Sequence, residues 1–489
     1  MRGAMLFAAI SAGVMAAVAC ASSENETSIP GPDAAPQPTP PSDGGTTTGD
    51  SSIPIRDTST CSAAGWCITV LPDSGLILKD IWPFERRAFA IAESYTLGIK
   101  VLEWDASSDA WKYIDDNTQN EYGIGKFAGK IWAASENEIY YSIDPGLVYH
   151  GERVAPSAPW SWERDLLADN SRDRNPAHDH GLAYADPNPD TSGAQRKPAT
   201  FQALGVWGTS SGDVYAWYAN TIFHRKSEDG GAPAWVTEYV LADPDAPEDA
   251  TYVFSAAGTG PDDVWFAGGR VRYDGTAGFE RNASCPVLIR KTANGYQRIV
   301  DAVINAGYCE YKAGTSGFYE GEYLPEPYPE FGLEAGLYTI PSMERAWMTN
   351  IASAGAGSVV GVMNGDSFAY VVASNDGGLA RRNRVKQLAV PSDSVVPWTL
   401  NSVWFNAGAA WVSGWGLVLR IGDSPAGWST GLGISNSPAG TYLDAGTYSV
   451  STTVINGVPL DAALYQIRGT SNSNLWAIGA QYALHKTTP

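Results

Sequence analysis

One short phrase recurs along the chain and restricts the possible folds more than any other feature. The three clearest copies span residues 206–216, 256–266 and 467–477. Each is a short apolar run with Gly-Thr, a turn of small and polar residues, and a second apolar run with an aromatic residue. This is the pattern of a β-hairpin. A hairpin that returns along the chain predicts a repeat architecture and argues against an ordinary single-site enzyme fold.

Seven units can be aligned on this phrase. The closest spacings are roughly 50 residues, which fits a unit of four strands. The chain contains 18 Trp, 24 Tyr and 52 Gly, and such a composition favours many short strands and tight turns. We therefore predict an all-β fold, a seven-bladed β-propeller. The units begin near Ile81, Ile131, Val206, Ser255, Ile351, Val403 and Ile467.

The unit that begins near Val403 illustrates the expected blade. Residues 402–405 would form strand a, residues 410–413 strand b and residues 417–421 strand c, and Trp428 would open strand d. Each of these runs is apolar and is bounded by Gly, Ser or Asp, as strands in a meander are.

The last unit supplies only three strands, which end at residues 483–486. The missing partner lies at the other end of the folded part, where residues 66–71 form an isolated apolar strand that starts with Trp66. An unpaired edge strand invites aggregation. We therefore predict that the propeller is closed by pairing of this N-terminal strand with the C-terminal blade.

Three turns, expected between strands c and d, combine Asp or Ser with Gly ahead of an apolar run. They are residues 227–231, 274–278 and 374–378. Asp accepts hydrogen bonds from the backbone amides of such a turn, and Gly permits a positive φ. Two of them resemble the Asp-box turn of sialidase-like propellers, although the aromatic residue is one place late in the first and absent in the second. That motif is structural in its family, so the resemblance implies a fold and no sialidase activity.

Taken whole, residues from about 60 to 489 resemble the β-propeller lipoproteins that occur in many copies in myxobacteria and their relatives. The blades of that family carry a Gly-Thr-Ser-x-x-Asp-Val-Trp-Ala phrase, and residues 208–216 and 469–477 are close to it. The resemblance implies a propeller in the cell envelope. It implies little about function.

The N-terminus predicts export. Residues 1–19 contain Arg2 and an apolar stretch too short to span a bilayer, followed at once by polar sequence, as in a signal peptide. Small residues before Cys20 resemble the bacterial lipobox, in which the Cys is lipidated; plain cleavage after Ala19 is the alternative. Residues 20–57 are rich in Ser, Pro and Thr and predict a disordered tether. The propeller would then occupy residues 58–489, lipid-anchored in the outer membrane or at the cell surface.

Cysteine usage agrees with an oxidising compartment. Lipidation of Cys20 would leave four cysteines, an even number that can form two disulfides. The local pairings are Cys61 with Cys67 and Cys285 with Cys309. Three connectivities remain open from the sequence.

The net charge of −21 excludes most nucleic-acid binders, which carry a basic patch. Anionic membrane surfaces would also repel the chain. We expect contact with a membrane only through the N-terminal lipid, and we expect a monomer.

Three segments exceed the blade length: residues 166–200, 303–346 and 430–463. Each is expected to connect a strand d with the next strand a, so that all three would emerge on one face of the propeller. Long connections clustered at one end of a rigid scaffold are the usual place for binding. We predict that this face binds a protein or polysaccharide partner.

The second segment alternates tyrosines with glutamates. A tyrosine offers a flat apolar face and a hydroxyl, which suits sugar rings or a protein partner. The alternative is that these rings pack against the propeller itself. The candidate ligand-binding residues are Tyr308, Tyr311, Tyr319, Tyr323 and Tyr328.

The first segment contains the candidate metal ligands. His178 and His180 lie on one side of an extended segment, but two ligands are too few for a zinc site. Asp186 and Asp190 imitate the start of a calcium loop, which then lacks its Gly and its bidentate Glu. We expect no cofactor, with Ca²⁺ as the alternative.

No catalytic constellation is recognisable. The chain has no Gly-x-Ser-x-Gly elbow, no His-Glu-x-x-His and no phosphate-binding Gly loop. His150, His224 and His485 are interpreted as ordinary strand residues. We therefore predict a binding module rather than an enzyme. A carbohydrate-active hydrolase or lyase with a site in the central channel is the alternative, and an adhesive component of a secreted appendage is a third possibility.

Overall fold

A computed structural model describes part of the second of two units, residues 1–55 and 56–489, into which the chain divides. The described residues are 60–62, 64–121, 127–170, 182–185, 199–227, 231–244, 246–272, 283–305, 308–312, 315, 319–320, 337–338, 347–363, 367–373, 384–387, 390–391, 400–421, 448–452, 455, 458 and 460–488. The signal peptide, Cys20 and the tether lie outside them.

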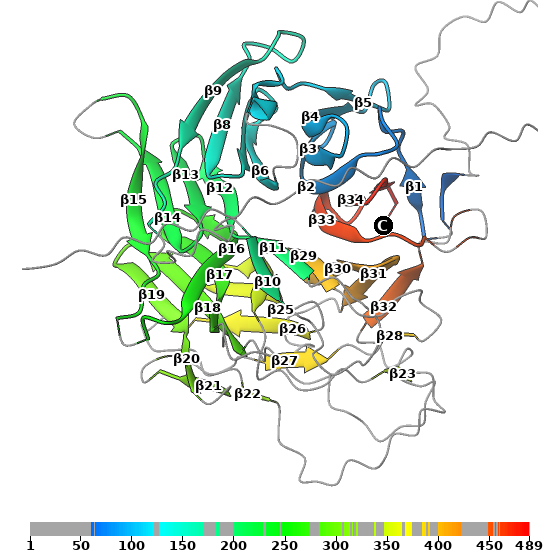
Figure 1. Cartoon of the computed structure of the whole chain (residues 1–489). Coiled ribbons are helices and arrows are strands. Elements are labelled where there is room, and N and C mark those ends of the chain that lie inside the picture. The colour runs from blue at the N-terminus through cyan, green and yellow to red at the C-terminus, as the bar shows by residue number, and fades with distance from the viewer. Residues whose placement is uncertain are drawn as a thin grey trace, which may run out of the picture. The chain divides into compact units, whose positions relative to one another are not determined.

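Within the described ranges the chain forms an all-β propeller (Figure 1). Six sheets contain strands that follow one another along the chain and pair antiparallel. The first three are β2 (Ile77–Pro83), β3 (Arg87–Ser94), β4 (Gly98–Asp105) and β5 (Ala110–Tyr113); β6 (Ala128–Ser135), β7 (Glu138–Ile143), β8 (Leu147–Glu152) and β9 (Ser161–Leu166); and β12 (Leu204–Ser210), β13 (Asp213–Tyr218), β14 (Thr221–Lys226) and β15 (Ala234–Val240). The next three are β16 (Ala250–Gly260), β17 (Asp263–Arg272), β18 (Ala283–Thr292) and β19 (Gly295–Val300); β24 (Met348–Gly355), β25 (Ser358–Met363), β26 (Ser367–Val372) and β27 (Arg384–Gln387); and β29 (Leu400–Asn406), β30 (Ala409–Gly414), β31 (Leu417–Ile421) and β32 (Tyr448–Thr452).

A further four-stranded sheet joins the two ends of the described chain. It contains β33 (Leu464–Ser471), β34 (Asn474–Gly479), β35 (Ala483–Lys486) and β1 (Trp66–Ile68), in the order β1-β35-β34-β33. β1 runs antiparallel to β35, with Trp66 opposite Lys486 and Ile68 opposite Leu484. The predicted pairing of these two segments is therefore present. Trp66 is fully buried and its ring meets that of Trp411 edge to face, with centroids 6.2 Å apart.

Smaller elements occupy the connections. β22 (Tyr319–Glu320) adds to β27 as a parallel fifth strand. A short 3-10 helix, η2, spans Thr118–Asn120. The remaining strands form two-stranded pairs: β10 (Leu182–Ala185) with β11 (Ala199–Gln202), β20 (Ala302–Asn305) with β21 (Tyr308–Tyr311), and β23 (Leu337–Tyr338) with β28 (Val390–Pro391).

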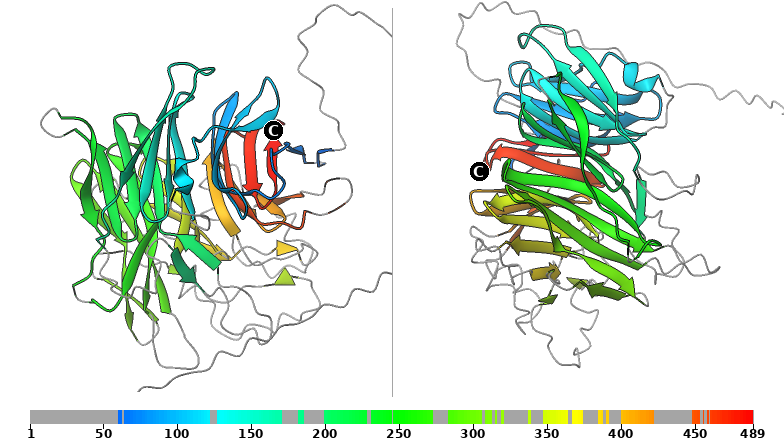
Figure 2. Two further views of the ribbon diagram at one scale, coloured as in Figure 1. Left: turned by 45° about the horizontal axis from the view of Figure 1, so that its top comes forward. Right: turned by 90° about the vertical axis from the view of Figure 1, so that its left-hand side faces the viewer.

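The sheets contact one another through their first strands. β6 contacts β2 and β12, β16 contacts β12 and β24, β29 contacts β24 and β33, and β33 contacts β2. The sheets therefore stand face to face within this unit, as Figure 2 shows from two further directions. The burial of the strands follows from this packing, because a sheet covered on both faces reads as a continuous apolar run. β25, β30 and β34 are buried at every residue, whereas the last strand β9 is mostly exposed.

A buried polar side chain links several neighbouring sheets. In the first strand of a sheet, a β-bulge precedes the repeated apolar residue and turns the polar residue before it toward the next sheet. Asp80 Oδ2 accepts a hydrogen bond from the amide of Ile131 at 3.0 Å. Ser402 Oγ accepts one from the amide of Ile467 at 3.2 Å. Equivalent bonds run from Ile351 to Ser255 and from Val403 to Asn350.

A second recurring set of contacts explains the repeated phrase, and we call it the hairpin clasp. It joins the polar residue that opens strand b to a Thr of strand a and to a His or Arg of strand c. In the β16–β19 sheet, Asp263 accepts hydrogen bonds from Thr259 at 2.7 Å, from the Trp265 indole at 3.0 Å and from Arg290 at 2.9 Å. Corresponding residues of the other clasps are Asp213 with Thr209 and His224, and Asn474 with Thr470 and His485.

The strand c member of each clasp also lies opposite an aromatic residue of the neighbouring strand b. His224 lies opposite Tyr215 and stacks on it with centroids 4.3 Å apart, and His485 stacks on Trp476 at 4.0 Å. His150 stacks on Tyr140 in the same way at 4.2 Å. These histidines are strand residues, as predicted, and they recur at the same position of strand c.

Two expectations about connections are wrong. The partner of β31 in the sheet is β32, Tyr448–Thr452, so strand d does not open at Trp428, which lies outside the described residues. Residues 422–447 therefore connect strands c and d, and the third long segment does not follow a strand d as a whole. Residues 274–278 lie between β17 and β18, which are strands b and c, and not between c and d.

No helix among the described residues is both long and apolar enough to span a bilayer.

Candidate functional site

The β16–β19 sheet carries a cluster of buried charge at one end. Arg270, near the end of β17, has a fully buried side chain. Its guanidinium lies 2.7 Å from Asp243, 3.0 Å from Asp301 and 3.4 Å from Asp249. The three aspartates lie in connections: Asp243 and Asp249 precede β16, and Asp301 follows β19. Connections b–c and d–a leave the sheet at this end.

Further cations complete the cluster. Arg298 donates to Asp301 at 2.7 Å and to the carbonyl of Ala242 at 2.8 Å. Lys312, from the second long segment, pairs with Asp243 and lies 3.1 Å from Asp301. Burial alone would raise the pKa of Asp301, but hydrogen bonding to Arg298 and the charges of Arg270 and Lys312 outweigh it and lower the pKa. Removing one partner of this cluster would leave an uncompensated charge in the interior, which costs folding free energy. The paired side chains are therefore fixed in position.

A disulfide fixes the same segment to the same sheet. Cys285, in β18, is bonded to Cys309, in β21, and Cys61 is bonded to Cys67. Both local pairings considered from the sequence are therefore formed. The amide of Lys312 donates to the carbonyl of Asp301 at 3.0 Å, so the chain returns to the end of β19 after the β20–β21 hairpin. The start of the second long segment is thus held by a covalent bond, by ion pairs and by backbone hydrogen bonds.

The candidate tyrosines are distributed along several elements. Tyr308 and Tyr311 lie in β21, and Tyr311 is half-buried against the core of this sheet and its neighbour. Tyr319 lies in β22, at the edge of the β24–β27 sheet. Tyr323 and Tyr328 lie outside the described residues. The described part of the segment therefore contacts one sheet and pairs with the next, and no cluster of tyrosine rings can be assigned from it.

The candidate metal ligands also lie outside the described residues: His178, His180, Asp186 and Asp190. The central residues of the three Asp/Ser-Gly turns, two of which resemble the Asp-box, lie outside them too. The first long segment does contain the β10–β11 hairpin between β9 and β12, so it connects a strand d with a strand a as predicted.

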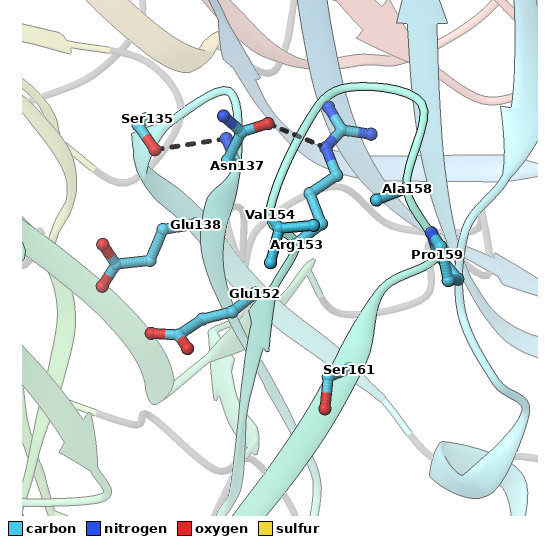
Figure 3. A pocket seen from close by; sticks show the side chains of 9 residues that line it. All are labelled: Ser135, Asn137, Glu138, Glu152, Arg153, Val154, Ala158, Pro159 and Ser161. Carbon is cyan, nitrogen blue, oxygen red and sulfur yellow. Dashed lines mark hydrogen bonds between the residues drawn. The ribbon is translucent and has the colours of Figure 1, made fainter.

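The β6–β9 sheet carries a pocket at the end where its a–b and c–d turns lie. It is open, has a volume of ≈ 470 Å³, and forms between the β6–β7 turn and the β8–β9 connection (Figure 3). Turns a–b and c–d meet at this end, whereas the long d–a segments leave at the other. No sequence pattern indicated this pocket. Its lining residues are Ser135, Asn137, Glu138, Glu152, Arg153, Val154, Ala158, Pro159 and Ser161.

A buried arginine forms one wall of this pocket. Arg153 binds Glu103 of the preceding sheet with two hydrogen bonds of 2.9 Å. It also donates to Asn137 Oδ1 at 3.1 Å, as Figure 3 shows, and stacks over the ring of Trp160 at 4.4 Å. A bidentate arginine–carboxylate pair is geometrically specific. The wall is therefore rigid, and the charge of Arg153 is already neutralised.

No protein-family model matches the chain. No curated protein matches it at a significant level. Solved structures with a similar fold include "YCF48 bound to D1 peptide", with 11% identity and a TM-score of 0.45 over 87% of this chain and 96% of that chain. "YCF48 from Cyanidioschyzon merolae" has 12% identity and a TM-score of 0.41 over 87% and 99%, and the WD40 β-propeller domain of Doa1 has 10% and 0.42 over 86% and 96%. Similarity at this level assigns neither a ligand nor an activity.

Proposed function

We propose that this chain is a non-catalytic, lipid-anchored envelope protein that binds a protein or polysaccharide partner through the d–a end of its propeller. The observation that carries the proposal is the attachment of the second long segment. A long connection is ordinarily ordered only when a partner binds, and the entropy lost in this ordering lowers the affinity. Here Cys309 and Lys312 fix the start of the segment to a rigid sheet, which reduces that entropic cost and presents the segment at one place.

The chemistry of this segment suits such a partner. Tyrosines offer flat apolar faces with a hydroxyl, and they are enriched where proteins bind partners. The segment between residues 308 and 338 contains six tyrosines and six glutamates. Its acidity favours a partner with cationic or hydroxyl-rich surface groups.

We also propose that the sheets form a closed ring of seven blades, with the β1-β35-β34-β33 sheet as the seventh. The pairing of β1 with β35 and the contact of β33 with β2 support this arrangement. A ring has no exposed sheet edge at its seam, and it would hold the d–a connections in a fixed array.

For the location, we propose export, lipidation at Cys20 and anchoring in the outer membrane. The two disulfides support an oxidising compartment. Membrane fractionation tests the anchor: Cys20→Ala should move the chain into the soluble fraction. Membrane association that survives this substitution would remove the anchor from the proposal.

Site-specific crosslinking tests the binding face. A photoreactive residue placed at exposed Glu310, in the β20–β21 hairpin, should crosslink the full chain to an envelope protein or to a polysaccharide in native envelopes. The matched control is exposed Ser473, in an a–b turn at the other end of a sheet. Crosslinks from Ser473 and none from Glu310 would place binding on the wrong end and overturn the proposal. A glycan array, with turnover assays on each hit, separates the two partner classes and detects any catalysis.

A further inference from the structure

Three potential metal ligands converge on the β6–β9 sheet. Glu138 opens β7, and His150 and Glu152 lie near the end of β8. One ligand atom of each residue lies within 4.8 Å of the other two. The convergence follows from the strand register, because Glu138 lies directly opposite Glu152, and His150 lies opposite Tyr140 on the same face.

The separations between the ligand atoms match those between two ligands of one metal ion. His150 Nε2 lies 3.5 Å from Glu138 Oε1 and 3.3 Å from Glu152 Oε1. A charge-assisted hydrogen bond would be about 2.7–2.9 Å long. Ligand atoms placed tetrahedrally about 2.1 Å from a zinc ion lie about 3.4 Å apart. His150 Nε2 is buried and faces these two carboxylates.

A cation shared by the two carboxylates would stabilise this part of the sheet. Like charges directly opposite each other in a sheet are destabilising. Arg153 does not neutralise them, because its guanidinium is bound to Glu103. Arg225 of the adjacent sheet lies 5.7 Å from the ring of Tyr140 and forms no ion pair with either glutamate among the described residues.

The other sheets provide an internal comparison. Glu138 and His150 occupy clasp positions, which are filled by Asp213 and His224 in the β12–β15 sheet. The clasp therefore accounts for two of the three ligands. It does not account for Glu152. Two places after the strand c member, the other clasps have Lys226, Thr292 and Thr487.

We propose that Glu138, His150 and Glu152 bind a divalent metal ion of the zinc class. An imidazole with carboxylates selects zinc or a neighbouring transition metal over magnesium and calcium. The side chain of Glu152 is 64% exposed and can close on the ion, while Glu138 and His150 are held in place by stacking and by the Tyr140 hydroxyl. Both carboxylates lie at one edge of the pocket (Figure 3), so the remaining coordination positions are open to solvent and to a ligand in that pocket.

Calorimetric titration of the purified, metal-stripped full chain with Zn²⁺ tests the site. We expect one zinc ion per chain, with an affinity that falls at least tenfold in Glu152→Gln and is lost in His150→Gln. Glu152→Gln changes an exposed side chain and should leave folding intact. His224→Gln, which changes the equivalent clasp without a third ligand, should retain the wild-type affinity.

A double variant separates this site from the one predicted from the sequence. His178→Gln with His180→Gln should bind zinc as the wild type does. Loss of zinc binding in that variant would overturn the inference, and so would an unchanged affinity in both Glu152→Gln and His150→Gln, or the absence of any binding to the wild type.

Discussion

Nε2 of His224 lies 3.1 Å from Oδ1 of Asp213, while Nδ1 of the same ring lies 3.3 Å from Oε1 of Glu238. One imidazole therefore joins three successive strands, β13, β14 and β15. Burial alone would lower the pKa of His224, but its contacts with Asp213 and Glu238 outweigh burial and raise it. The protonated ring is thus favoured by the folded state.

This raised pKa predicts a dependence of stability on pH. The contribution of His224 is fully present below the pKa of an unfolded histidine, about 6.5, and is lost as the pH rises through the folded pKa. Between pH 6 and pH 9 the wild type should lose about 0.5–1 kcal/mol of unfolding free energy from this partly exposed ion pair. Denaturant unfolding at both pH values should show a smaller loss in His224→Gln. The same pH dependence in both proteins would contradict this account.

The buried bond between neighbouring sheets predicts a larger effect at Ser402. The side chain is fully buried, accepts a hydrogen bond from the amide of Ile467 and donates one to Asn350 Oδ1 at 3.3 Å. Ser402→Ala leaves a buried amide without its acceptor, which should cost about 1–3 kcal/mol. Exposed Ser473→Ala is the control and should change stability little. Equal midpoint temperatures of thermal unfolding for Ser402→Ala and Ser473→Ala would refute the role of Ser402.

Removal of β1 should weaken the sheet that joins the chain ends. A chain that begins at residue 72 lacks Trp66, which is buried against Trp411, and loses the hydrogen bonds of β1 and of Thr69 to Ala483. Loss of a buried tryptophan alone costs about 3–5 kcal/mol. A chain that begins at residue 58 retains these contacts and should unfold at the wild-type denaturant concentration. Equal stability of the two truncations would argue against the proposed closure.

The sequence contains enough information for the strands but not for all connections. The pairing of residues 66–68 with β35 could be predicted, because a repeat with three strands at one end and one at the other has a single natural solution. The position of β32 could not, because Trp428 offered an equally plausible strand about 20 residues earlier in the sequence. Residues 274–278 were assigned to the wrong connection because Asp-Gly turns are equally suited to b–c and c–d hairpins.

The sites were harder to predict for a different reason. The buried cluster around Arg270 draws Asp243, Asp301 and Lys312 from three connections, and no spacing along the chain indicates that they meet. The approach of Glu138 to Glu152 depends on the β7–β8 register. A sequence pattern that compared strand c across the units could have found His150, His224 and His485 as one recurring position.

The two disulfides predict different consequences of cysteine removal. Cys285 and Cys309 are 24 residues apart and Cys61 and Cys67 are 6 apart. On chain-entropy grounds the first should contribute about 3.5 kcal/mol and the second about 2 kcal/mol. Hydrogen exchange distinguishes them further. Exchange of the amides in β20 and β21 should accelerate in Cys285→Ser with Cys309→Ser, because that bond fixes the hairpin to β18. The exchange of these amides should not change in Cys61→Ser with Cys67→Ser, because that disulfide involves β1 and lies in another sheet. Unchanged exchange in the first double variant would mean that the ion pairs and backbone hydrogen bond of Lys312 are sufficient to hold the start of the second long segment in place.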